Sequence, residues 1–429
     1  MQALKTQLDT TASDYLEAKK NMQLLELAIK TLLKNAQEQG KEKQLATARK
    51  QGRLTGRERI ELLLDQDSPF LELMPKLGYT LNMEKEGIKL VAGIGLVSGK
   101  LCLISANIGT LKTNLFDENT QVKSLRLKRI AIENRLPLVQ LLESNEESVI
   151  PTKTTESPLE QTVSGINLVL NEAVLPLLQQ ASALDYTIFI KNRLPDALKY
   201  KADYLAENEL DALRIIREVV DSFSDNHTFS PILIPTDIAP LHPIKDLQGM
   251  QFGLGKGLFD IRELMVRLVD RSEFTEYKAG FGKKMVAGFA NIHGFPIGIL
   301  ANNAPIGKEE VVKLADFVRR CNQQHRSLLF IQNSIAFSLE ILENAENPLL
   351  TIENALKNST IPTLCIKIGC NKFTEKTPPI YGNAHQPRFL FSYLADLTHY
   401  DSNIMPSETR NHLAFALATI YNNVVEGEI

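Results

Sequence analysis

The sequence of 429 residues contains no tryptophan, and aromatic residues make up only 7% of it. A surface on which nucleic-acid bases stack depends on aromatic side chains, so this kind of function is not expected. Neither sign of charge is in marked excess, because 48 lysines and arginines stand against 51 acidic residues and leave a formal net charge of −3. No positive field results that would attract nucleic acid or an anionic membrane. The composition therefore predicts neither of these two partners.

Cysteine, histidine and long apolar runs are also scarce. None of the four cysteines forms a CxxC pair, and none of the seven histidines has HxH or HxxxH spacing, so we predict neither a disulfide framework nor a metal site. No apolar run approaches the ~20 residues that span a bilayer. The first 20 residues lack the basic region and apolar stretch of a signal peptide. We therefore expect a reducing compartment, either the cytoplasm or an organelle matrix.

Core-forming material is present in ordinary amounts. Hydrophobic residues make up 44% of the chain and charged residues 23%, which is typical of a folded protein. Residues 224–258 are rich in proline and glycine and carry few helical signals, so they are predicted to link two domains. We predict an N-terminal helical arm over 1–60, followed by domains over 61–223 and 259–429.

The predicted arm begins with an amphipathic helix. Apolar residues recur there near helical spacing: Leu16, Leu24, Leu25, Ile29, Leu32 and Leu33. The heptads are too few for a free coiled coil, so the arm is expected to pack on the body or on a partner subunit. Residues 41–59 are rich in lysine and arginine, which favours a solvated helical face over a phosphate-binding role.

One part of the sequence is repeated. Residues 93–107, GIGLVSGKLCLISAN, match residues 288–302, GFANIHGFPIGILAN, at a constant offset of 195. Each copy is followed by a loop, a helix with basic residues and a strand, over 136–144 in the first copy and 327–334 in the second. Two copies of a strand–turn–strand–helix–strand unit predict two similar α/β domains.

The repeated segments also match a known family. The matching stretches are GRLTGRERIELLLDQDSPFLEL (52–73), GIGLVSGKLCLISAN (93–107), KSLRLKRIAIENRLPLVQLLES (123–144), FDIRELMVRLVDRSEFTEYKAGFG (259–282) and VAGFANIHGFPIGILANN (286–303). On these stretches the chain resembles the carboxyltransferase (β) subunit of biotin-dependent acyl-CoA carboxylases, most closely the methylcrotonyl-CoA carboxylase branch.

The resemblance implies a fold and a chemistry. The fold would consist of two crotonase-like (ββα spiral) domains, of which the N-terminal one takes acyl-CoA and the C-terminal one takes biotin. The reaction would transfer a carboxyl group from carboxybiotin to a short branched or propionyl-type acyl-CoA. No cofactor would be bound covalently, because the biotin is carried by a partner, the biotin carboxylase or biotin carrier subunit. A homo-oligomer is also implied, since the family's site lies between subunits.

The same resemblance predicts an impaired site. Transfer passes through two oxyanions that backbone N–H groups of glycine-rich loops stabilise. Where the family has Asp-Ser-Gly-Gly-Ala, this chain has Glu-Ser-Asn-Glu-Glu over 143–147, and a strand with a glycine-rich turn is missing between about 176 and 187. In the second domain an alanine replaces a usual glycine, and the strand TLCIKIG runs into cysteine instead of a glycine-rich run. The catalytic positions that the resemblance implies, all degenerate, are Asn145, Glu146, Ala336, Gly369 and Cys370.

Candidate contacts to coenzyme A follow from the same alignment. They are Lys112, Lys123, Arg126 and Asn134, of which Lys123 and Arg126 match basic positions of the family motif. A solvated face explains these two basic residues equally well. Three functions stay open at this point: an active carboxyltransferase, a non-catalytic scaffold or regulatory subunit of a carboxylase-like assembly, and an acyl-CoA-binding protein with a rebuilt site.

Overall fold

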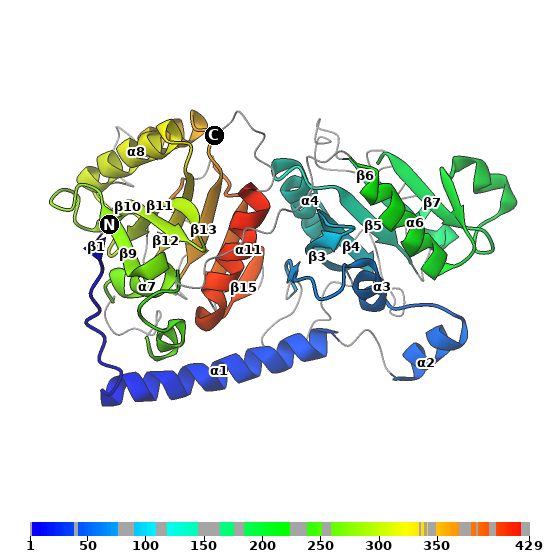
Figure 1. Ribbon diagram of the computed structural model, residues 1–429, viewed down its shortest axis with the longest axis horizontal. Coiled ribbons are helices and arrows are strands. Elements are labelled where there is room, and N and C mark those ends of the chain that lie inside the picture. Colours follow the sequence, from blue (N-terminus) through cyan, green and yellow to red (C-terminus); the bar gives the residue numbers. More distant parts are fainter. Residues whose placement is uncertain are drawn as a thin grey trace. The chain divides into compact units, whose positions relative to one another are not determined.

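The computed structural model consists of two compact units (Figure 1). One comprises Thr31–Pro231, and the other Met1–Lys30 together with Ile232–Ile429. None of the helices within the described residues is long and apolar enough to cross a membrane. The structure describes residues 2–37, 42–75, 90–108, 118–144, 164–175, 184–223, 238–250, 259–333, 336–338, 341, 349–368, 379–382, 385–393 and 400–421.

The N-terminal unit is built on a seven-stranded mixed sheet with the strand order β2-β3-β4-β5-β6-β7-β8. The strands are β2 (Phe70–Glu72), β3 (Leu90–Val97), β4 (Lys100–Asn107), β5 (Leu138–Leu142), β6 (Gly165–Val169), β7 (Tyr186–Ile190) and β8 (Tyr204–Ala206). The first three are antiparallel, and β4 to β8 run parallel. The helices are α2 (Glu42–Lys50), α3 (Gly56–Leu63), α4 (Glu118–Glu133) and α6 (Glu209–Asp221), with short 3-10 helices at Glu172–Val174 and Asp196–Lys201. One face of the sheet forms an apolar core with α3 and α6.

The C-terminal unit repeats this plan in an eight-stranded sheet, with the order β1-β9-β10-β11-β12-β13-β14-β15. Its strands are β1 (Gln2–Ala3), β9 (Glu273–Glu276), β10 (Met285–Ile292), β11 (Phe295–Asn302), β12 (Ser327–Gln332), β13 (Thr363–Lys367), β14 (Phe389–Tyr393) and β15 (Ser402–Ile404). Its helices are α7 (Arg262–Leu268), α8 (Lys308–Gln323), α10 (Leu349–Lys357) and α11 (Thr409–Tyr421), with 3-10 helices at Ile244–Gly249, Asp270–Ser272 and Pro406–Glu408. Helix α1 (Ser13–Gln37) begins in this unit.

The predicted internal repeat is confirmed by the order of the elements. The series β3, β4, α4, β5 corresponds to β10, β11, α8, β12, with an antiparallel hairpin followed by a parallel strand in both. Both hairpins turn through two residues of positive φ, Ser98 and Gly99 in one and His293 and Gly294 in the other. Such turns match the twist of the flanking strands, which is why both copies keep this geometry.

Polar contacts are repeated as well. The carboxylate of Asp65 accepts the amides of the first turn at 2.9 and 2.7 Å, and Asp270 accepts those of the second turn at 2.8 and 2.7 Å. Each aspartate is paired with an arginine of the last helix of its unit, Arg217 at 2.7 Å and Arg410 at 2.8 Å. The repeat therefore extends to side chains that were not part of the sequence match.

The glycines that begin the repeated segments are explained by close packing. A Cβ atom on Gly93 would lie 2.4 Å from the Phe70 ring and 2.5 Å from the Leu71 carbonyl oxygen. One on Gly288 would lie 2.4 Å from the Phe274 ring. No other residue fits without displacing the neighbouring strand, so both copies retain glycine.

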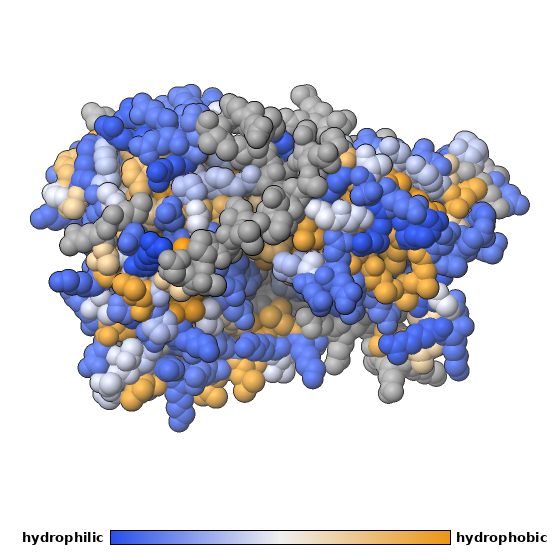
Figure 2. All heavy atoms as spheres, in the orientation of Figure 1, coloured by the Kyte–Doolittle hydropathy of each residue, from blue (hydrophilic) through white to orange (hydrophobic). Residues whose placement is uncertain are grey.

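The N-terminal residues pack against the C-terminal unit. Strand β1 pairs with β9, and Thr6 donates a hydrogen bond to Glu263 at 2.6 Å. The packed face of α1 is not formed by the leucines singled out from the sequence: Leu16, Leu24 and Leu25 are exposed. The buried residues are Tyr15, Ala18, Met22 and Glu26, together with Ile29, which belongs to the predicted set. Figure 2 shows hydrophobic surface along the lower edge of the molecule, where α1 runs in Figure 1.

Candidate functional site

Polar residues gather where the parallel strands of the N-terminal unit end. Glu143 follows β5 directly, Asn171 lies two residues beyond β6, and Arg193 and Glu209 lie three residues beyond β7 and β8. Because parallel strands end at one edge of a sheet, these side chains are brought together. Ligands of open α/β sheets bind at this edge, which makes it the candidate site.

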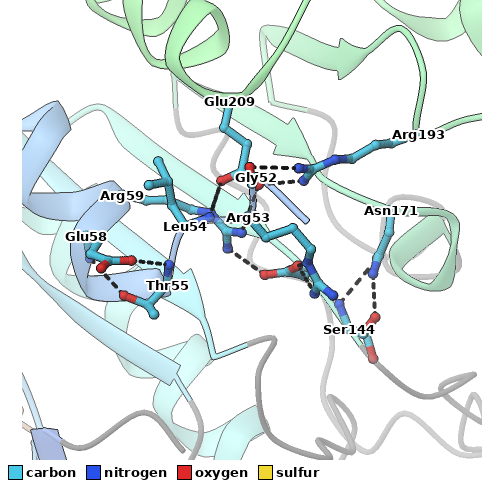
Figure 3. A network of polar contacts seen from close by, with 11 residues as sticks. Gly52, Arg53, Leu54, Thr55, Glu58, Arg59, Ser144, Asn171, Arg193 and Glu209 are labelled. Carbon is cyan, nitrogen blue, oxygen red and sulfur yellow. Dashed lines mark hydrogen bonds and ion pairs between the residues drawn. The ribbon is translucent and has the colours of Figure 1, made fainter. Parts of the chain in front are cut away.

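An ion-pair network fills this edge (Figure 3). Arg59, on α3, donates to Glu143 at 2.6 Å and to Glu209 at 2.8 Å. Arg53 also donates to Glu143, at 2.9 Å through its Nε atom. Arg193 donates to Glu209 at 2.5 Å. Three guanidinium groups therefore alternate with two carboxylates and join α3 to the ends of β5, β7 and β8.

The centre of the network is shielded from water. The side chain of Arg59 is completely buried, and those of Glu143 and Glu209 are each 3% exposed. Burial by itself would lower the pKa of Arg59, but the two carboxylates raise it above its ordinary value. Burial would raise the pKa of Glu209, but Arg59 and Arg193 hold it below its ordinary value. Both groups therefore stay charged, as buried ion pairs must to offset their desolvation.

The local sequence explains how α3 reaches this position. Thr55 caps the helix by accepting the Glu58 amide, and Glu58 accepts the Thr55 amide at 2.7 Å, which is a complete capping box. The Leu54 amide donates to Glu209 at 3.2 Å. The solvated face predicted for residues 41–59 is wrong for Arg59, because its side chain is completely buried. Its two acidic partners lie more than 80 residues away in sequence.

Ser144 marks the point where the described part of this edge stops. Its amide donates to the Asn171 Oδ1 atom at 3.3 Å, and Asn171 Nδ2 donates back to the Ser144 carbonyl oxygen. The end of β5 is thus fixed from two sides, by Arg53 and Arg59 on Glu143 and by Asn171 on Ser144. Asn145 and Glu146, which were predicted for the oxyanion loop, lie outside the described residues, as do Gly369, Cys370 and Lys112.

The remaining predicted residues occupy separate places. Lys123 is buried, and its ammonium group donates to the carbonyl oxygens of Leu90 at 2.7 Å and Met74 at 3.2 Å. Asn134 is buried beyond the end of α4 and donates to the Ile130 carbonyl oxygen at 2.9 Å. Arg126 is half-buried on α4. The structure thus gives Lys123 and Asn134 contacts within the unit, and their role in binding coenzyme A stays a prediction.

The Lys123 contact belongs to the repeat. Lys313 is its counterpart in the C-terminal unit and donates to the carbonyl oxygen of Met285 at 2.8 Å. Leu90 and Met285 are the first residues of β3 and β10. Burial lowers the pKa of both lysines, to about 8 for Lys123. Both lysines therefore anchor a hairpin to the following helix.

The equivalent edge of the C-terminal unit holds Ala336. This residue is buried, and its carbonyl oxygen accepts the Ile306 amide at 2.9 Å. At the end of β12, Asn302 Oδ1 accepts the Asn333 amide at 2.9 Å. The loops after β11 and β12 are therefore tied together. Among the described residues, no group of three or more His, Cys, Asp and Glu side chains could hold a metal ion.

Comparison with known proteins places this geometry in a family. A family model described as "Carboxyl transferase domain" matches residues 47–147 and 201–344. A probable biotin-dependent acyl-coenzyme A carboxylase beta2 subunit of Mycobacterium tuberculosis is 33% identical over 434 residues, which cover 91% of this chain and 81% of that protein. The biotin-dependent 3-methylcrotonyl-coenzyme A carboxylase beta1 subunit of the same organism is 30% identical over 391 residues, covering 80% and 73%.

A solved structure shows the same fold. The beta subunit of geranyl-CoA carboxylase from P. aeruginosa superposes with a TM-score of 0.80 at 23% identity, over 98% of this chain and 97% of that one. This superposition confirms the predicted fold of two crotonase-like domains. The family model and the 33% identical relative confirm the family resemblance that was predicted from the sequence. The chain therefore belongs to the carboxyl transferase domain family.

Proposed function

We propose that this chain is a β-type carboxyltransferase subunit of a biotin-dependent acyl-CoA carboxylase in which the carboxyl-transfer step is lost or strongly reduced. The observation that carries the proposal is the end of β5. Glu143 and Ser144 are held in place there, and the residues that follow are Asn145, Glu146 and Glu147 instead of glycines.

The chemistry explains why this change matters. Removing a proton from an acyl thioester creates an enolate, and its oxygen needs backbone N–H donors at close range. Glycine permits that approach because it has no Cβ atom. The carboxylates of Glu146 and Glu147, which replace residues of that loop, would oppose the negative charge that develops on the enolate oxygen. Loss of one oxyanion donor typically lowers turnover about 10²–10³-fold.

The fixed strand end strengthens this argument. Because Arg53 and Arg59 hold Glu143 and Asn171 holds Ser144, the loop must start from this one position. A shift of the strand end would separate buried charges, which is strongly unfavourable. The chain therefore cannot easily make room for side chains in the loop by moving β5.

The C-terminal unit supports the same conclusion. Ala336 occupies a position at which the family that the chain resembles has a glycine. Ala336 is buried, and its carbonyl oxygen accepts a hydrogen bond from the Ile306 amide. Its methyl group packs in the apolar core of this unit, so the loop lacks the conformational freedom that a glycine would give it near the anionic ureido oxygen of biotin. Biotin would supply the carboxyl donor from a partner subunit, while this chain's own residues would bind and orient the two substrates.

The test runs the transfer in reverse, which requires no partner subunit. The purified chain is incubated with methylmalonyl-CoA or 3-methylglutaconyl-CoA and free biotin. Transfer moves the carboxyl group to the biotin ureido nitrogen, and the enolate left behind takes up a proton. We expect no biotin-dependent loss of either thioester above the rate without protein. The M. tuberculosis 3-methylcrotonyl-coenzyme A carboxylase beta1 subunit serves as the active control.

A loop variant sharpens this test. Asn145→Gly combined with Glu146→Gly restores glycine at two positions but leaves Ala336 and the second domain unchanged. We expect this variant also to be inactive. Biotin-dependent turnover by the unmodified chain would overturn the proposal and make an active subunit the better interpretation.

A scaffold role is compatible with the same structure, because the ion pairs and the repeat that hold the fold are complete while the loop residues are changed. This role requires a homo-oligomer and binding of a biotin-carrying subunit. Light scattering at micromolar concentration should then show an oligomer, because obligate interfaces bury thousands of Å². A monomer at that concentration would contradict the scaffold role.

A further inference from the structure

Three aromatic rings pack together on the face of the C-terminal sheet that α8 covers. The ring centres of Tyr277, which follows β9, and Phe289, on β10, lie 5.4 and 5.0 Å from that of Phe317 on α8. Phe317 is completely buried, whereas Tyr277 and Phe289 are half-buried and border the core. Their outer faces are therefore open to side chains at the surface of this unit.

Cationic side chains cover these two outer rings. The guanidinium group of Arg326 lies 5.0 Å from the centre of the Phe289 ring, and that of Arg320 lies 5.9 Å from the centre of the Tyr277 ring. The ammonium group of Lys278 lies 5.2 Å from the same Tyr277 ring. A cation within about 6 Å of an aromatic ring is attracted to its face. The rings therefore hold three cations in place at the surface.

The N-terminal unit shows that the fold does not require cations or aromatic rings here. Its residues at the equivalent positions are apolar and buried. They are Leu73, Ile94, Ile130 and Leu136, in place of Tyr277, Phe289, Arg320 and Arg326.

Backbone hydrogen bonds fix this correspondence. Arg326 and Leu136 each donate an amide hydrogen bond to the carbonyl oxygen five residues earlier, at 3.0 and 2.8 Å, and each follows a residue with a φ of 50°. Tyr277 and Leu73 donate to equivalent alanines of β10 and β3, at 2.7 and 2.8 Å. The helix residues six positions before Arg326 and Leu136 therefore correspond as well.

Positive charge is in excess on this part of α8. The second half of the helix and the three residues that follow it carry three arginines and one acidic residue, Asp316. Asp316 already pairs with Lys278 at 2.7 Å and with Arg319 at 3.6 Å. Neither Arg320 nor Arg326 forms an ion pair with another described residue. A local positive charge therefore remains on a chain whose net charge is −3.

The arrangement of the cations favours one kind of anionic partner. The faces of Tyr277 and Phe289 are covered by cations, so they are not free to stack on nucleic-acid bases. Arg320 and Arg326 lie over different rings, so the cations are spread over the surface and do not converge on one point as a compact phosphate would require. The planar guanidinium group matches the geometry of a carboxylate. An extended chain with several carboxylates fits these features best.

We propose that the surface formed by Lys278, Arg319, Arg320 and Arg326 is a docking site for an extended acidic segment of a partner protein. The carboxylates of that segment would accept hydrogen bonds from the guanidinium groups. Because the rings beneath already hold the arginine side chains, less conformational entropy is lost on binding. The inference is independent of the proposed function, since none of these four residues takes part in it.

Fluorescence anisotropy with three labelled probes tests the inference on the full chain. The probes are a peptide of Glu-Ser repeats, the matching uncharged peptide of Gln-Ser repeats, and a thymidine oligonucleotide with as many negative charges as the first peptide. The surface variant, Arg320→Ile with Arg326→Leu, introduces the residues of the N-terminal unit. At low salt, where exposed charges are least screened, we expect only the Glu-Ser peptide to bind well. The surface variant should bind it about tenfold more weakly, since each exposed ion pair lost lowers affinity up to about fivefold.

A matched control separates this surface from the net charge of the protein. Arg49→Leu with Arg214→Ile also removes two arginines, whose side chains are 67% and 57% exposed, and should leave binding of the Glu-Ser peptide unchanged. Thermal melting shows whether the variants fold. If the surface variant does not, Arg320→Gln with Arg326→Gln takes its place.

Three results would overturn the inference. The Glu-Ser peptide could fail to bind the unmodified chain at millimolar concentration, which would leave these cations as a solvated face. The folded surface variant could bind the peptide as tightly as the control variant does. The oligonucleotide could bind more tightly than the peptide and lose affinity in the same surface variant, which would indicate a nucleic-acid site. None of these results affects the proposed function, whose failure would appear as biotin-dependent turnover.

Discussion

Replacing Arg59 by methionine should destabilise the N-terminal unit strongly. Arg59 is the central cation of the network and pairs with both Glu143 and Glu209. Removing one partner of a buried ion pair typically costs about 3–5 kcal/mol. Each carboxylate retains one arginine, Arg53 or Arg193. We therefore expect a loss of about 3 kcal/mol, at the lower end of that range.

The absence of tryptophan makes a measurement on this unit alone feasible. A Tyr186→Trp background places a single tryptophan on β7, and its fluorescence during urea unfolding reports on the N-terminal unit. The control is Arg129→Met, which removes a pair with Glu133 in which the arginine side chain is 45% exposed. An exposed pair of this kind is worth less than about 1 kcal/mol.

The same network predicts a dependence on pH. The pKa of Glu209 is lowered in the folded state from the ordinary value of 4.5. Its stabilising contribution is therefore complete above that value and is lost as the pH falls through the folded-state pKa. The Arg59→Met variant should lose less stability than the parent between pH 5 and 3. At pH 7, the free energy of unfolding should fall more in Arg59→Met than in Arg129→Met. An equal or smaller decrease in Arg59→Met would refute the assignment of Arg59 as the central stabilising cation.

Three further outcomes follow from buried titratable groups. Burial lowers the pKa of Lys123 from 10.5 to about 8, so between these pH values the unfolded chain binds more protons than the folded one and stability rises with pH. Lys123→Met should abolish that rise in urea titrations at pH 8 and 10. An equal increase in the free energy of unfolding in the variant and the unmodified chain would contradict this prediction. Burial and Arg410 lower the pKa of His293, against the opposing effect of Asp270, so stability of the C-terminal unit should fall as the pH drops below about 6.5. His293→Ser, which copies Ser98 of the other repeat, should reduce that loss in melts at pH 7 and 5, and an unchanged loss would exclude His293 as its source. Burial raises the thiol pKa of Cys321 and Cys365 to about 12 and that of Cys102 still higher. None of the three should react with a thiol reagent at pH 8 in the folded protein, and mass-spectrometric detection of labelling within minutes would contradict their burial.

Much of the fold could be predicted from local patterns. Gly93 and Gly288 lie in hairpins whose neighbouring strands leave no room for a side chain. This packing constraint appears in the sequence as a glycine at the same position of both repeats. Alternation of apolar residues between turn signals gives the strands, because side chains on a strand point to opposite faces with a period of two.

The site was determined by pairings over long sequence distances. The acidic partners of Arg59 are 84 and 150 residues away, and no local pattern distinguishes it from a solvated arginine. The exposed leucines of α1 show the same limit, since helical periodicity defines a face but not which face finds a partner.

The sequence by itself determined the family, the two related α/β units and the loss of glycine at the end of β5, because each depends on which residue stands at which position. Only the tertiary structure decided that three arginines and two glutamates hold that strand end. The physical reason is that burial and pairing arise when distant segments meet in space, and the free energy of a charge or an amide depends on those surroundings more than on its neighbours along the chain.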